Sequence, residues 1–221
     1  MGHPAGSHEP RFVDAHIHIK RFEGIASIAA AGIAAVRDAG TRDNAERRTV
    51  PTARHGGSPD ILSACWALYK KGGYGSRLGM PVETRADISA EILKLKNAGA
   101  GIIKVMASGI VSIKDPGRVT AGGFDRDELR FLVNEAALHG LRVMAHANGE
   151  QAILNAADAG VHSVEHGFFM TEHALKALSD KKIFWVPTVG ALARAARAGM
   201  ASRGAEKFFD DLIRDHLRMI G

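Results

Sequence analysis

Residues 11–19 read Arg-Phe-Val-Asp-Ala-His-Ile-His-Ile, an apolar segment that carries two histidines one residue apart. Side chains at positions i and i+2 of a β-strand point to the same face, so the rings of His16 and His18 can reach one cation. Neutral imidazole is a preferred ligand of zinc-type ions. The pair therefore predicts two metal ligands or, as the simpler alternative, the half-exposed face of a strand.

Outward from this segment, short apolar or β-branched runs alternate with stretches of helical periodicity. We predict strands at about residues 12–18, 34–37, 61–65, 102–106, 142–146, 163–166 and 184–187. Helices are predicted over residues 88–97, 126–138, 151–157, 172–179 and 205–219. Left-handed caps are expected at four glycines that follow helical stretches, namely Gly32, Gly99, Gly140 and Gly160. Such a series of βα units predicts parallel strands, in either a doubly wound sheet or a (β/α)8 barrel.

The placement of polar residues decides between these two architectures. A barrel takes its active-site groups from the carboxyl ends of several strands, whereas an open sheet gathers them at one switch point. Here Lys104, His146 and His166 lie in or at the end of three further predicted strands. No glycine-rich phosphate loop follows the first strand. We therefore predict an α/β fold, a TIM-type (β/α)8 barrel that is incomplete, with about seven βα units.

Composition narrows the class of protein. The chain has 221 residues, 46% of them hydrophobic, which fits one domain with a substantial core. Its net charge of +5 is spread along the sequence and only 6% of residues are aromatic, so no nucleic-acid surface is expected. The single cysteine, Cys65, lies in an apolar run and is expected to be a buried thiol. Without a membrane-length segment or a signal peptide, we expect a cytoplasmic protein that does not enter the membrane.

Lys104 stands in the run Gly-Ile-Ile-Lys-Val-Met, where a charged amine loses its hydration. Burial lowers the pKa of such an amine, and a neutral lysine can add carbon dioxide to become a carbamate that bridges two metals. The alternatives are a lysine whose amine reaches solvent and a Schiff-base lysine of an aldolase-type barrel. His146 and His166 can likewise be hydrogen-bonded structural residues. Taken one residue at a time, the sequence leaves these alternatives open for Lys104, His146 and His166.

The ordered set of motifs resembles the amidohydrolase superfamily, and within it the imidazolonepropionase-like and prolidase-like branch. The strings that carry the likeness are Phe-Val-Asp-Ala-His-Ile-His (12–18), Ala-Ala-Val-Arg-Asp-Ala-Gly (34–40), Ile-Ile-Lys-Val-Met-Ala-Ser-Gly (102–109), Val-Met-Ala-His-Ala-Asn-Gly (143–149), Ser-Val-Glu-His-Gly (163–167) and Trp-Val-Pro-Thr (185–188). The likeness spans roughly residues 10–190. It implies an enzyme that hydrolyses a C–N amide bond of a dipeptide, a lactam or a similar small amide.

The resemblance also implies a ligand set. His16 and His18 would bind one divalent ion, expected to be zinc, and His146 and His166 a second, with carboxylated Lys104 as the bridge. A hydroxide held between the two ions would be the nucleophile.

Other residues near these strands are expected to support the site. Ser108, Gly109 and Asn148 follow two of the strands and are candidates to face the substrate. Asp14, Glu165 and the Arg37-Asp38 pair are expected either to orient ligands or to make ordinary strand-end hydrogen bonds.

The sequence departs from the family pattern at both ends. The aspartate expected after an eighth strand, usually in a Gly-Thr-Asp string, is not found, and Asp210, Asp211 and Asp215 lie in a predicted helix. We expect a disordered tail over residues 1–10, a partial barrel over residues 11–221, and no β-sandwich domain. Open strand edges lead us to expect a homo-oligomer. The alternatives to an amidohydrolase are a Schiff-base aldolase or lyase using Lys104, and a truncated barrel that binds metal without catalysis.

Overall fold

The computed structural model describes residues 12–20, 25–47, 59–112, 114–197 and 206–220, and the predicted tail over residues 1–10 lies outside them. The described strands are β1 (Phe12–Ile17), β2 (Ile33–Asp38), β3 (Asp60–Ser63), β4 (Ala67–Lys70), β5 (Gly79–Val82), β6 (Ile102–Met106), β7 (Arg142–Ala147), β8 (Ser163–His166) and β9 (Phe184–Val186). The described helices are α1 (Ile25–Ala30), α2 (Arg42–Arg47), α3 (Arg85–Asn97), α4 (Arg126–Leu138), α5 (Glu150–Ala159), α6 (Glu172–Asp180), α7 (Val189–Arg197) and α8 (Glu206–Arg218).

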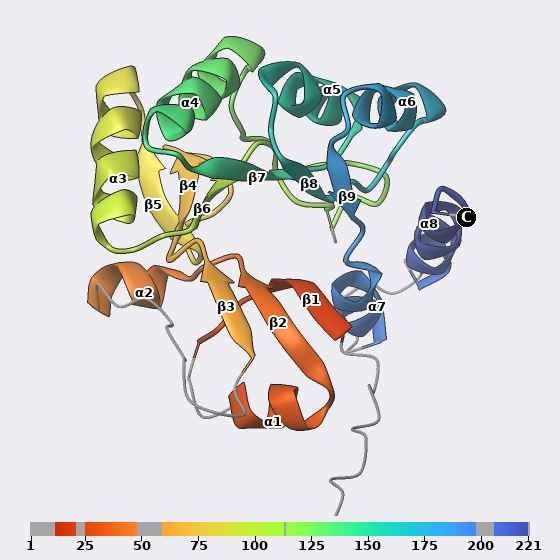
Figure 1. Cartoon of the computed structure of the whole chain (residues 1–221). Coiled ribbons are helices and arrows are strands. Elements are labelled where there is room, and N and C mark those ends of the chain that lie inside the picture. Colours follow the sequence, from red (N-terminus) through yellow and green to blue (C-terminus); the bar gives the residue numbers. More distant parts are fainter. Residues whose placement is uncertain (1–11, 21–24, 48–58, 113, 198–205, 221) are drawn as a thin grey trace, which may run out of the picture.

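The strands form two parallel sheets, as Figure 1 shows, in the orders β1-β2-β3 and β5-β4-β6-β7-β8-β9. The backbone N–H of Gly101, just before β6, donates to the carbonyl oxygen of Ser63 at the end of β3, at 2.9 Å. This hydrogen bond links the end of β3 to the start of β6, so the two sheets are adjacent. The α/β class with parallel strands is confirmed, whereas no ladder joins β1 to β9 in the described part of the chain, so the barrel is not closed there.

The strand predicted at about residues 61–65 is confirmed as β3, which ends two residues earlier, at Ser63, whereas β4 and β5 were not predicted. Cys65 has a positive φ of 59°, which ends β3 and turns the chain before it resumes as β4. β3 then pairs with β2, and β4 pairs with β5 and β6. A backbone bend of this kind leaves no pattern in side-chain hydrophobicity, and the segment Ala67–Lys70 has no β-branched residue to mark it as a strand.

The helices α3, α4, α5 and α6 cover the outer side of the six-stranded sheet (Figure 1). Buried Leu129 and Leu132 of α4 pack in the same cluster as Ile103 and Val105 of β6. Both α3 and α4 begin with a capping box, made by the N-caps Thr84 and Asp125. The four predicted glycine caps all have positive φ, between 69° and 89°. In the described part of the chain, no helix combines the length and apolarity that crossing a bilayer requires.

The register of the ladders brings the predicted site residues together at the carboxyl edge of the six-stranded sheet. Met106 pairs with His146, and Ala147 pairs with His166, so the carboxyl ends of β6, β7 and β8 lie together. Because all strands run in parallel, the loops that follow them gather at that edge.

Candidate active site

Four histidines from three strands meet in the interior. The ring centroids of His16 and His18 are 5.4 Å apart, those of His16 and His166 are 4.9 Å apart, and those of His146 and His166 are 4.5 Å apart. The fold thus brings residues that are separated by about 150 positions into one cluster, which we call the histidine cluster. It consists of the four histidines that the sequence singled out.

Each ring in the histidine cluster has one nitrogen held by the protein. His16 Nδ1 donates to Glu165 Oε2 at 2.6 Å, and His18 Nδ1 donates to the Gly40 carbonyl oxygen at 2.6 Å. His146 uses Nε2 instead, which donates to the Gly109 carbonyl oxygen at 2.9 Å. The opposite nitrogens, Nε2 of His16 and His18 and Nδ1 of His146, therefore keep their lone pairs. Metal-binding histidines are held in this manner.

Burial keeps these rings neutral. It lowers the pKa of His16 to about 4 and the pKa of His146 to about 3, with the positive charge of Lys104 as the next cause in each case. Burial also lowers the pKa of His166 and that of His18. At neutral pH the cluster is therefore a set of unprotonated imidazoles, the form that binds metal ions.

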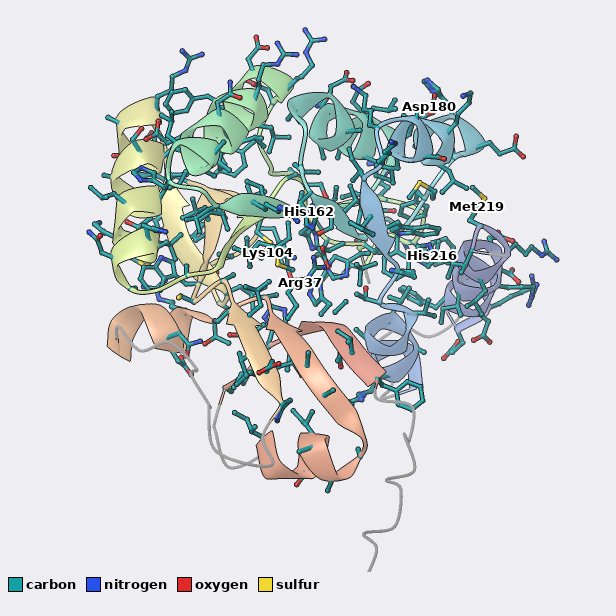
Figure 2. The ribbon with its side chains drawn as sticks, viewed as in Figure 1. Arg37, Lys104, His162, Asp180, His216 and Met219 are labelled. Atoms are coloured by element: carbon teal, nitrogen blue, oxygen red, sulfur yellow. The ribbon has the colours of Figure 1, made fainter. Side chains whose placement is uncertain are left out.

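Lys104 is the buried polar group next to this cluster. The residue is 1% exposed, and its Nζ atom has no hydrogen-bond partner within the described structure. Desolvation lowers the pKa of this amine to about 8, against the opposing effect of Glu165. Figure 2 draws Lys104 and Arg37 in the interior, between the two sheets. An orphaned buried amine among neutral imidazoles fits the donor chemistry of a metal site in which the lysine is carboxylated.

The described side chains do not by themselves form a complete metal-binding site. Among the described His, Cys, Asp and Glu residues, no three are arranged so that they could hold an ion. The fit therefore rests on the free nitrogens and on the unpartnered amine, and the five predicted ligands stay a prediction.

Charged residues hold two rings of the histidine cluster in place, those of His16 and His18. Glu165 is fully buried; its Oε1 accepts a hydrogen bond from Arg37 Nη2 at 2.7 Å while its Oε2 accepts from His16. Asp38 Oδ1 accepts from the backbone N–H of Ile19 and of Gly40, each at 3.0 Å, and this fixes the carbonyl that holds His18. Glu165 thus contacts His16 directly, whereas Arg37 acts on the cluster through Glu165 and Asp38 acts through the backbone of Gly40.

The three predicted substrate residues form one hydrogen-bonded unit. Ser108 Oγ donates to the Gly109 carbonyl oxygen at 2.8 Å and accepts from the Asn148 backbone N–H at 2.9 Å. Asn148 Oδ1 accepts from the Phe168 backbone N–H at 3.0 Å. Of the three, Asn148 lines the cavity beside the histidine cluster, and the other two hold it in place. Contact of these residues with the substrate stays a prediction.

This cavity has a volume of about 240 Å³ and is walled mainly by apolar side chains. His18, Lys104, His146 and His166 form its polar end. Sequence reasoning missed the apolar wall, whose members include Tyr74, Phe168 and Leu192. Its one local signal is the loop Gly72-Gly73-Tyr74-Gly75, because three glycines within four residues indicate a tightly folded backbone.

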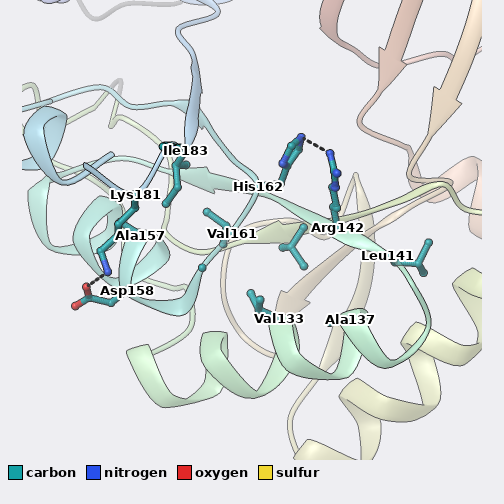
Figure 3. Close-up of a pocket in the computed structure, with 13 residues that line it drawn as sticks. Val133, Ala137, Leu141, Arg142, Ala157, Asp158, Val161, His162, Lys181 and Ile183 are labelled. Atoms are coloured by element: carbon teal, nitrogen blue, oxygen red, sulfur yellow. Dashed lines mark hydrogen bonds and ion pairs between the residues drawn. The ribbon is translucent and has the colours of Figure 1, made fainter. Parts of the chain in front are cut away.

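A separate cavity of about 480 Å³ lies at the amino end of β7 and beside α5, away from the histidine cluster (Figure 3). Arg142 Nη1 and His162 Nε2 are 3.4 Å apart across it, and Lys181 pairs with Asp158 at 3.2 Å. In parallel α/β barrels the amino ends of strands serve stability rather than catalysis. The candidate active site is therefore the cavity at the carboxyl ends.

Comparison with known proteins agrees with this geometry. The sequence model described as the amidohydrolase family matches residues 9–196. Ochratoxinase from Aspergillus niger is 39% identical over 90 residues, which are 41% of this chain and 18% of that protein.

Solved structures share the fold. A prolidase complexed with N-methylphosphonate-L-proline superposes with a TM-score of 0.75 at 24% identity, covering 95% of this chain and 62% of that one. The structure of A. niger ochratoxinase gives 0.72 at 19% identity, covering 95% and 59%. A Xaa-Pro dipeptidase with bound methionine gives 0.71 at 22% identity, covering 94% and 59%. The chain thus spans about three fifths of the length of these structures.

Proposed function

Since the chain belongs to the amidohydrolase family, we propose that it takes part in the metal-dependent hydrolysis of a C–N amide bond in a small molecule such as a dipeptide or a lactam. The observation that carries this proposal is the juxtaposition of four neutral histidines with the buried, unpartnered amine of Lys104. The hydrolase relatives support the reaction class.

We propose the following metal ligands. His16 and His18 would hold one divalent ion, His146 and His166 a second, and Lys104 as a carbamate would join them. Two bound divalent ions, expected to be zinc, supply polarisation of the scissile carbonyl and a water of lowered pKa.

The rest of the site prepares the ligands and the substrate. Glu165 and the Gly40 carbonyl fix the tautomers of His16 and His18, so that Nε2 of each ring faces the interior unprotonated. Phe168 and Leu192 belong to the apolar wall of this cavity, and we expect this wall to limit the entry of water, which strengthens electrostatic interactions inside the cavity.

Elemental analysis of protein purified without chelator tests the proposal, together with intact mass under mild conditions. We expect about two divalent ions per chain, the added mass of one carbon dioxide, and hydrolysis of a panel of dipeptides and lactams. Lys104→Met is expected to lose the added mass and most of the metal. Lys96→Met, at an exposed position on α3, is the matched control and is expected to lose neither.

The same experiment separates the alternatives. A metal-free protein that is trapped on Lys104 by borohydride in the presence of a carbonyl compound would be a Schiff-base enzyme. Two ions without hydrolysis of any substrate in the panel would indicate a metal-binding barrel without catalysis. Either result would refute the proposed function for this chain.

A further inference from the structure

Contacts from the end of β9 hold His166, the fourth member of the histidine cluster. Its Nδ1 atom lies 2.5 Å from the Thr188 hydroxyl oxygen, and its carbonyl oxygen accepts a hydrogen bond from Trp185 Nε1 at 2.9 Å. Gly167 follows with a φ of 68°, and a Cβ there would lie 2.5 Å from Trp185 Nε1, so this position requires glycine. Both the ring and the backbone of His166 are therefore placed by residues of β9 and its carboxyl end.

Thr188 directly precedes α7, a position at which a threonine hydroxyl commonly caps the helix. Thr84 and Thr171 cap α3 and α6 in this way, because each hydroxyl accepts from the backbone N–H three residues later. At α7 the corresponding N–H, that of Ala191, donates to the Thr188 carbonyl oxygen instead, at 3.2 Å. The hydroxyl of Thr188 is thereby available to His166.

The backbone at this contact has an unfavourable conformation. Thr188 has a φ of 48°, and His166 has a φ of 68°. A β-branched residue rarely adopts a positive φ, and such a conformation persists only where surrounding contacts hold it. Strained positions of this kind cluster at functional sites, so the conformation of Thr188 points to a role beyond the connection of β9 to α7.

His216 of α8 holds the peptide group that precedes Thr188. Its Nε2 atom lies 3.1 Å from the Pro187 carbonyl oxygen and donates to it, since a carbonyl oxygen can only accept. Burial lowers the pKa of His216, so the ring is uncharged at neutral pH. The Pro187 carbonyl lies in the peptide plane whose rotation sets φ of Thr188, and the hydrogen bond therefore opposes relaxation of Thr188 to a negative φ.

Packing fixes the ring of His216 in turn. The residue is 3% exposed, and its ring stacks on Phe168 at a centroid distance of 4.5 Å and meets Trp185 edge-on at 4.9 Å. Phe209 and Leu212 of α8 pack in one cluster with Phe168. Figure 2 draws His216 between α8 and β9. The helix α8 thus contacts both the apolar wall of the cavity and the end of β9.

We propose that Thr188 and His216 are positioning residues for His166, an inference that rests on the proposed metal site. Thr188 Oγ1 accepts a hydrogen bond from His166 Nδ1–H, which leaves the lone pair on Nε2 for a metal ion. His216 acts one contact further away, because it holds the Pro187 carbonyl and so keeps the Thr188 hydroxyl within reach of the ring.

The tautomer of His166 in the metal-free protein tests the role of Thr188 without any catalysis. Nitrogen NMR, with the ring signals assigned by comparison with His166→Gln, is expected to show the proton on Nδ1 at neutral pH. Thr188→Val keeps the branched shape without the hydroxyl and should move the proton to Nε2, whereas Thr188→Ser should keep it on Nδ1. A proton on Nε2 in the parent, or an unchanged tautomer in Thr188→Val, would overturn the inference.

Zinc affinity, measured by competition with a chelator, is the second readout. Loss of a contact that orients a metal ligand typically weakens binding about 10- to 100-fold, and we expect this loss for one of the two ions in Thr188→Val. Thr84→Val removes a hydroxyl from the same helix position of α3 and should leave zinc binding unchanged. Parent-like zinc affinity in Thr188→Val would contradict a positioning role, whatever its effect on stability.

Variants of His216 test the more distant contact. His216→Phe keeps a ring against Phe168 but has no donor, and it is expected to shift the His166 tautomer and to weaken one zinc ion about three- to tenfold. His216→Gln can still donate to the Pro187 carbonyl oxygen and should restore both properties. His173→Phe, at an exposed position of α6, is the matched control and should change neither.

If His216→Phe does not fold, His216→Leu removes the same donor and takes its place. A folded variant without the donor that keeps the parent's tautomer and zinc affinity would show that His216 only packs α8 against the cavity wall. That result would overturn the role of His216 in the inference.

The two proposals fail separately. A protein that binds no divalent ion would refute the proposed function, and the tautomer of His166 would still decide whether Thr188 positions the ring. Two bound zinc ions together with a tautomer that does not respond to Thr188→Val would overturn the positioning role and leave the proposed function intact.

Discussion

Replacing Lys104 by methionine is expected to have opposite effects on the metal-free and the metal-loaded protein. Methionine keeps the length and apolar character of the side chain but has no amine. In the metal-free protein the Lys104 amine is fully buried and has no partner within the described structure, so it contributes only the loss of its hydration. The variant is therefore expected to be more stable than the parent when metal is removed.

The magnitude follows from the pKa of Lys104, which burial lowers from 10.5 to about 8. This difference corresponds to about 3 kcal/mol, which we take as the upper limit of the gain in the free energy of unfolding below pH 8. Between pH 8 and 10.5 the unfolded parent holds a proton that the folded parent has released, so the parent's stability rises with pH. The advantage of the variant should thus disappear above pH 10.5.

Urea denaturation of both proteins with chelator and with excess zinc measures these effects. Zinc is expected to stabilise the parent and to stabilise Lys104→Met far less, because the bridging ligand is gone. Lys96→Met, exposed on α3, should remain within about 0.5 kcal/mol of the parent in both conditions. A metal-free variant less stable than the parent by more than about 1 kcal/mol would refute the reasoning, and equal stabilisation by zinc would exclude Lys104 as a ligand.

Three further predictions concern stability. Glu165→Gln removes the buried partner of Arg37 and is expected to cost about 3–5 kcal/mol in urea denaturation; a loss below about 1 kcal/mol would contradict the buried ion pair. Burial lowers the pKa of His16 to about 4 and of His146 to about 3, so from pH 6.5 downward the unfolded chain takes up protons first. The metal-free protein should lose up to about 1.4 kcal/mol per pH unit for each of these histidines, and a melting temperature that is constant between pH 7 and 5 would be inconsistent with neutral buried rings. Thr84→Ala deletes the side-chain cap of α3 and should lower the free energy of unfolding by about 1 kcal/mol, whereas Thr84→Ser should retain most of it.

Helices and strands were predicted best where the hydrophobic pattern of the sequence matches the face that is buried in the fold. The strand Ile102–Met106 and the helix Arg126–Leu138 have the predicted bounds, because a continuous apolar run and a helical stripe each reflect one buried face. The helix also carries a capping box at Asp125. Both the α/β class and the parallel order follow from repetition of such units.

The end of β3 at Ser63 and the two strands that follow it could not be predicted from the sequence pattern in this way. Cys65 adopts a positive φ inside an apolar run, and nothing in its side chain indicates that conformation. The strand Gly79–Val82 contains glycine and proline, which disfavour strands, yet it pairs in parallel with Ala67–Lys70. Tertiary hydrogen bonding therefore overrides local propensity at both places.

By itself, the sequence determined the residue types of the site and the edge at which they meet. His16, His146 and His166 lie near the carboxyl ends of parallel strands, and those ends must share one edge. Tertiary structure alone decided which nitrogen of His16, His18 and His146 stays free, how deeply Lys104 is buried, and that Tyr74 lines the cavity beside the histidine cluster. Those properties depend on contacts between segments far apart in the chain, and their geometry is set by packing rather than by periodicity.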